Sequence, residues 1–185
     1  FKNFEECVTD IVKYNDTRAL KAFINNHMLT DEHIQICASK AAHVGNVDIL
    51  KCLLDHFQVD DQQARVNTLL STVALNASAS GHVNVLRWLV SHSVDLKQVK
   101  NSSTNENVAH MAAAHNQVNV LKLLVEQGVS LTSQNTDHQT PLHIALRSGK
   151  IDLLRPMLDS GLDLKAEIKN DKSLIKVAAA FCQDF

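Results

Sequence analysis

The sequence predicts an all-α protein made of helix pairs stacked in a row. Two observations lead to this prediction. Corresponding residues recur 33 positions apart, as His110 and His143 do, and as Gly128 and Gly161 do. Within each copy, apolar residues fall at the three- and four-residue spacing of one helix face. A short unit that repeats in this way buries its apolar surface against its neighbours rather than within itself.

The stretch from 137 to 164 is the clearest copy. Thr140 offers a hydroxyl N-cap, and Pro141 follows at the first helical position, where its missing N–H is not needed. Gly149 is placed to end this short helix, because glycine accepts the left-handed conformation common at helix C-termini. A second amphipathic helix follows and ends near Gly161. The copy therefore reads as helix, turn, helix and loop.

The T-P-L-H-x-A element at 140–145, together with the period near 33, resembles the ankyrin-repeat family. The element is complete only once, but the glycine and leucine pattern recurs over nearly the whole chain. The resemblance implies an ankyrin-type solenoid of antiparallel helix pairs with short hairpin-like loops. We expect a single ankyrin domain over 1–185, part of a longer chain, with five to six diverged repeats at about 1–29, 30–67, 68–101, 102–134 and 135–167 and a partial repeat at 168–185.

Three places depart from the regular pattern. The polar stretch 58–67 carries an insertion of about three residues, which we expect in a loop because it would disturb helix packing. Asn105 and His138 replace the usual hairpin glycine, and both residue types tolerate positive φ. Pro156 lies inside the second helix of the fifth repeat, where we expect a kink or an irregular turn and a cost of about 3 kcal/mol.

The composition excludes several functional classes. The net charge is −2 with no long basic run, so strong binding to a nucleic-acid backbone is not expected. No apolar run of about 18 residues predicts a membrane span. The four cysteines show neither C-x-x-C pairs nor zinc-ligand spacing, which favours structural thiols in a reducing compartment. We therefore expect no metal, no cofactor and no catalytic residues.

The histidines have two readings. The resemblance implies that His143, His110 and His82 make structural hydrogen bonds to backbone around the turns. His43 and His115 come just before a turn, at positions that face the concave groove in ankyrin proteins. They are either solvated surface residues or groups that contact a partner or respond to pH.

The positions that line the groove in ankyrin proteins can be transferred to this sequence by repeat register. They give the candidate partner-binding residues. They comprise the ends of the first helices and the tips of two hairpins. Tyr14 and Arg147 are of the types that often anchor interfaces. The complete set is Lys13, Tyr14, His43, Val44, Ala79, Ser80, Ser103, Thr104, Glu106, Ala114, His115, Thr136, Asp137, Gln139, Arg147 and Ser148.

The predicted function is protein–protein interaction by a non-enzymatic scaffold. The groove would bind a partner protein or another domain of the same chain. The alternative is a substrate-selecting module of a larger enzyme whose catalytic domain lies outside these residues. We expect an intracellular, cytoplasmic location. The irregular periods and many Asn and Gln residues also resemble the arrays that bacterial pathogens deliver as effectors into the host cytosol.

Overall fold

The computed structural model describes residues 4–26, 29–57, 63–163, 169 and 175. Within these ranges the regular structure is helical, apart from one isolated antiparallel bridge between Lys100 and Asn107. The predicted all-α fold is confirmed. The chain divides into two compact units, residues 1–94 and 95–185, which are described in turn. A single array spanning 1–185 stays a prediction, and nearly all of the expected partial repeat at 168–185 lies outside the described residues.

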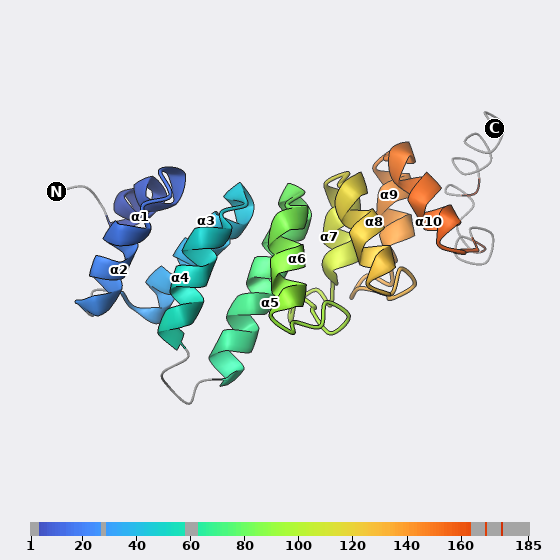
Figure 1. Ribbon diagram of the computed structural model, residues 1–185. Helices are drawn as coiled ribbons and strands as arrows, with labels where there is room; N and C mark the ends of the chain where they lie inside the picture. The colour runs from blue at the N-terminus through green and yellow to red at the C-terminus, as the bar shows by residue number, and fades with distance from the viewer. Residues whose placement is uncertain (1–3, 27–28, 58–62, 164–168, 170–174, 176–185) are drawn as a thin grey trace. The chain divides into compact units, whose positions relative to one another are not determined.

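Unit 1 (residues 1–94) contains three helix pairs arranged in two layers (Figure 1). The first helices pack side by side in one layer, α1 against α3 and α3 against α5. The second helices form the other layer, α2 against α4 and α4 against α6. The bounds are α1 Phe4–Lys13, α2 Thr17–Asn25, α3 Asp31–Val44, α4 Val47–Phe57, α5 Gln63–Ser80 and α6 Val83–Ser91.

A left-handed residue joins the two helices of each pair in unit 1. Asn15, Gly45 and Gly81 have φ values of 52°, 82° and 84°. These residues occupy corresponding places in the three copies, so the recurring Gly or Asn reflects the backbone conformation of the turn. Asn15 and Asp16 lie in the turn between α1 and α2, and Asp16 caps α2 by accepting from the amide of Ala19.

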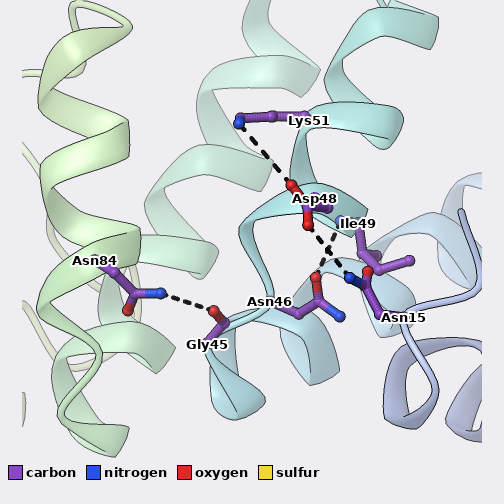
Figure 2. A network of polar contacts seen from close by, with 7 residues as sticks. All are labelled: Asn15, Gly45, Asn46, Asp48, Ile49, Lys51 and Asn84. Atoms are coloured by element: carbon purple, nitrogen blue, oxygen red, sulfur yellow. Dashed lines mark hydrogen bonds and ion pairs between the residues drawn. The ribbon is translucent and has the colours of Figure 1, made fainter.

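Polar side chains link each turn of unit 1 to the turn before it (Figure 2). Asn84 Nδ2 donates to the carbonyl oxygen of Gly45 at 2.9 Å. One repeat earlier, Asn15 Nδ2 donates to Asp48 Oδ2 at 3.2 Å, and Asn46 Nδ2 donates to the carbonyl of Val12 at 3.2 Å. These bonds satisfy backbone and side-chain groups at the junction and fix the register between neighbouring pairs.

The expectation of a loop over all of 58–67 is wrong for the part that the structure describes. Residues 63–67 form the first turn and a half of α5, which is 18 residues long. The segment contains no Gly or Pro to end a helix, and α5 packs beside α3, which is itself 14 residues long. Arg65 forms an ion pair with Asp31 at the start of α3. The added length therefore extends a packed helix, and residues 58–62 lie outside the described residues.

Unit 2 (residues 95–185) has the same two-layer arrangement, with shorter first helices. The first helices α7 and α9 pack together, and α10 packs on α8. Asn105 and His138 have φ values of 54° and 58° at the loop tips, as predicted. The bounds are α7 Val108–Ala114, α8 Val118–Glu126, α9 Pro141–Arg147, the 3₁₀ helix η1 Ile151–Leu153 and α10 Leu154–Asp159.

Pro156 sits where its missing N–H costs little. An irregular turn was predicted here, and the structure has the 3₁₀ helix η1 followed by α10, which begins only at Leu154. Pro156 is thus the third residue of α10, within the first turn, whose amides have no partner inside the α-helix. The expected cost of about 3 kcal/mol applies to helix interiors and does not arise at this place.

The interior of both units is made mainly of leucine, isoleucine, valine and alanine. Leu86, Leu121 and Leu154 occupy corresponding second-helix positions and are fully buried. Ala41, Ala74 and Ala112 are fully buried on first helices, where their small side chains let neighbouring first helices approach closely. The predicted burial of the apolar stripes is confirmed.

We predict that Gly45→Ala destabilises the protein more than Gly149→Ala. Both glycines have positive φ, so alanine costs about 1–2 kcal/mol at either place. A Cβ at Gly45 would also lie 2.5 Å from His82 Nδ1, whereas a Cβ at Gly149 meets no described atom within 4 Å. Relieving that overlap should add about 1–3 kcal/mol. Denaturant unfolding of the two variants measures the difference, and equal losses would show that His82 does not pack on this turn.

Candidate functional site

In unit 1, the candidate groove residues lie at the C-terminal ends of the first helices. Lys13 is the last residue of α1 and Tyr14 follows it, while His43 and Val44 end α3. Tyr14 is 68% exposed and Val44 is 56% exposed. The ammonium of Lys13 lies 5.2 Å from the centre of the Tyr14 ring, within cation–π range. Two large apolar side chains thus stand in solvent at corresponding positions of neighbouring helix pairs.

His43 is exposed but is not merely solvated. Its Nδ1 is hydrogen-bonded to Ser80 Oγ at 2.6 Å, which links the ends of α3 and α5. Its carbonyl oxygen accepts from His82 Nε2 at 2.7 Å. Two of the candidate contact residues, His43 and Ser80, therefore bind each other, and a partner would have to compete with that bond. Ala79 beside them is half-buried.

In unit 2, the candidates at the hairpin tips fall into two groups by their exposure. Ser103, Thr136 and Asp137 have exposed side chains. Thr104, Glu106 and Gln139 are half-buried and bonded within the loops. Thr104 Oγ1 donates to Glu106 Oε2 at 2.9 Å, and the Thr104 carbonyl accepts from the amide of Thr136 at 2.9 Å. The Gln139 amide donates to Asn135 Oδ1 at 2.9 Å, and the Gln139 carbonyl accepts from the Asn135 amide at 3.0 Å.

The remaining candidates are exposed at the ends of the first helices of unit 2. Ala114 ends α7 with His115 as its C-cap, and Arg147 ends α9 with Ser148 as its C-cap. The half-buried Met111 and Ile144 lie three residues before Ala114 and Arg147, so they share the same helix face. Lys40 likewise lies three residues before His43 on α3, and its Nζ donates to Thr9 Oγ1. The sequence-based set omitted these three residues, although helical spacing alone would have found them.

Comparison with known families assigns this architecture. A family model described as ankyrin repeats, in three copies, matches residues 75–168, which is just over half of the chain. The chain belongs to the ankyrin-repeat family. The matched stretch covers the third to fifth of the expected repeats, and ankyrin repeats are generally protein–protein interaction modules. No curated protein matches the chain significantly.

Two histidines of the ankyrin repeats support the loops, as the resemblance implied. His110 is fully buried, and its Nε2 donates to the carbonyl of Gln139 at 3.0 Å, which joins α7 to the following hairpin. Its Nδ1 accepts from the amide of Asn107 at 3.2 Å. His143 accepts at Nδ1 from the Thr140 amide, and Thr140 accepts from the His143 amide, both at 3.4 Å. These are reciprocal capping boxes, so both histidines have a structural role at the start of a first helix.

Two buried thiols of unit 1, Cys37 and Cys52, are poorly suited to act as nucleophiles. Burial, reinforced by the nearby Cys52, raises the pKa of the Cys37 thiol to about 12. Burial also raises the pKa of Cys52. Such thiols stay protonated at neutral pH, where the thiolate is the nucleophile. Among the residues described, no three His, Cys, Asp or Glu side chains gather as a metal site would require, and no helix is long and apolar enough to cross a membrane.

We predict that His110 makes stability depend on pH. Burial lowers its pKa below the usual 6.5, opposed by its bond to the Gln139 carbonyl. The unfolded chain then binds a proton more readily than the folded protein, so stability falls as pH drops below about 6.5 and levels off above it. His110→Gln keeps a capping side chain and should flatten this dependence between about pH 7 and 5.

Thermal unfolding across that pH range measures the effect. His115→Gln is the matched control, because His115 is exposed at the end of the same helix pair's first helix. It should keep the wild-type slope. A His110→Gln protein with an unchanged slope would assign the pH dependence to other groups.

Proposed function

We propose that this chain binds a partner protein, or another domain of its own longer chain, through the groove residues at the ends of its first helices. The observation that carries the proposal is the exposure of Tyr14 and Val44, at 68% and 56%. Both precede the left-handed residue of a turn, Tyr14 just after α1 and Val44 at the end of α3, and these two helices pack side by side. Large exposed apolar side chains on neighbouring helix pairs suit a partner segment that carries apolar side chains itself.

The surroundings of these two residues favour an anchor surface over random exposure. Lys13 and His43 lie next to them in sequence and supply polar groups at the edge, as interfaces commonly have. The turns beneath are tied to one another by the Asn15, Asn46 and Asn84 bonds, so the surface is preorganised. The buried thiols Cys37 and Cys52 support an intracellular setting, since reduced cysteines persist there.

A module that selects substrates for a catalytic domain elsewhere in a longer chain would use the same surface. In that arrangement the catalytic groups would belong to the other domain, and this surface would only select the substrate. Binding, rather than catalysis, is therefore the function to test.

We predict that the double variant Tyr14→Ala and Val44→Ala loses partner binding. Removing two exposed anchors leaves the fold intact, because neither side chain is in the core, but should weaken binding at least about tenfold. Wild type and variant are immobilised and the captured proteins are quantified. Ile151→Ala is the matched control, because Ile151 is an apolar residue 45% exposed outside the groove set.

The expected result is a captured protein that is lost with the double variant and retained with Ile151→Ala. Arg147→Ala, tested separately, reports whether the unit 2 positions contribute to the same partner. Equal recovery of every captured protein by wild type and the double variant would rule out these anchors.

A further inference from the structure

The loops that follow α8 and α10 have the same backbone structure. Each ends its helix with a left-handed glycine, Gly128 at φ 70° and Gly161 at φ 86°. The hydrogen bonds around the two glycines also correspond, position by position. They run from Gly128 to Val125 at 2.9 Å, from Val129 to Leu124 at 2.9 Å, from Gly161 to Leu158 at 2.9 Å and from Leu162 to Met157 at 3.4 Å.

The space over the first of these glycines is filled by a lysine. A Cβ added to Gly128 would lie 3.4 Å from Cε and 3.6 Å from Nζ of Lys97. The end of the Lys97 side chain therefore lies against the C-terminal turn of α8. A cation is favourable there, because the carbonyl end of a helix carries partial negative charge.

Among the residues that the structure describes, no lysine fills the equivalent space over the second glycine. Lys97 comes four residues after the left-handed Ser93, and Thr132 comes four residues after the left-handed Gly128. Thr132 therefore takes the place of Lys97 one repeat later, with a much shorter side chain. Among the residues described, no atom lies within 4 Å of a Cβ built on Gly161.

A hollow of about 330 Å³ results between the two loops. This volume is at the lower end of the range for ligand pockets. Val125, Leu131 and Leu162 contribute apolar surface to it, and Ser130, Thr132 and Ser160 contribute hydroxyl-bearing side chains. The apolar surface suits an alkyl chain.

The electrostatics at Gly161 suit a positive charge. Gly161 follows the carbonyl end of α10, and the exposed carboxylate of Asp159 lies two residues before it. Arg155 reaches Asp159 at 3.9 Å, through a side chain that is itself 64% exposed, which leaves the pair largely screened by solvent. An alkyl chain that ends in an ammonium group combines both requirements.

We propose that this hollow, the Gly161 pocket, receives a lysine side chain from a partner protein. The side chain would lie as that of Lys97 does over Gly128, with its methylenes against the apolar wall and its ammonium at the C-terminal turn of α10. The pocket is separate from the first-helix ends that carry the proposed groove, and the assignment does not depend on that groove.

The test is an NMR titration of the labelled protein with two capped tripeptides, Ala-Lys-Ala and Ala-norleucine-Ala. Norleucine keeps the alkyl chain and lacks the ammonium. The lysine peptide should shift the amide signals of Gly128, Gly161 and Leu162, and the norleucine peptide should bind at least about tenfold more weakly. Free n-butylammonium is a third probe and should also bind more weakly than the lysine peptide, since it lacks the peptide backbone.

Thr132→Lys places a lysine in the register position of Lys97 and should fill the pocket from within. It should move the Gly161 amide signal without any peptide, in the direction that the lysine peptide moves it in wild type, and should reduce peptide binding at least about tenfold. Gln134→Lys is the matched control: it adds the same charge two residues away, at an exposed residue that does not line the pocket, and should keep binding.

Each other outcome overturns the assignment. Absence of shifts at the pocket with the lysine peptide, equal binding of lysine and norleucine peptides, or undiminished binding to Thr132→Lys would each contradict it. Binding of n-butylammonium as tight as that of the lysine peptide would identify a site for free amines rather than for a protein. If Thr132→Lys does not fold, Thr132→Met fills the same space without charge and must likewise abolish lysine-peptide binding.

Discussion

The helix pairs that the structure describes bury their apolar faces against neighbouring pairs, and that requirement governs the rest of the structure. Leu86, Leu121 and Leu154 are fully buried although each helix pair has only two short helices. In both units, first helices pack on first helices and second helices on second helices. Burying one leucine contributes about 1.5–3 kcal/mol, so the stacking of neighbouring pairs, more than helix propensity, stabilises the array.

Close stacking restricts the turns between the helices. Each turn must reverse the chain within two or three residues, which requires a left-handed residue such as Gly45 or Asn15. His82 packs on Gly45 from the next repeat, and Asn84 binds the Gly45 carbonyl. The polar groups at these turns thus form hydrogen bonds between neighbouring repeats. Tyr14 and Val44 are exposed beside these turns, and they are the side chains that we propose contact a partner.

Hydrogen bonds within the protein also decide which loop residues of unit 2 remain exposed. The loop tips need internal bonds to hold their positive-φ residues, and Glu106 and Gln139 supply them. The buried His110 adds a bond from α7 to the next hairpin. Candidate contact residues at corresponding repeat positions therefore fall into two groups. Some are held by hydrogen bonds within the loops, and the others are exposed.

The sequence by itself determined the all-α fold, the family, the caps at Thr140 and the left-handed positions at Asn105 and His138. These features depend on residues near one another in the chain, where spacing and residue type carry the information. Only the tertiary structure decided that residues 63–67 extend a helix, that His43 binds Ser80, and that Lys97 lies over Gly128 while Thr132 leaves a hollow. Each of these depends on a neighbouring repeat about thirty to forty residues away. A local pattern does not reveal how far a side chain reaches across that interface, and packing between repeats decides it.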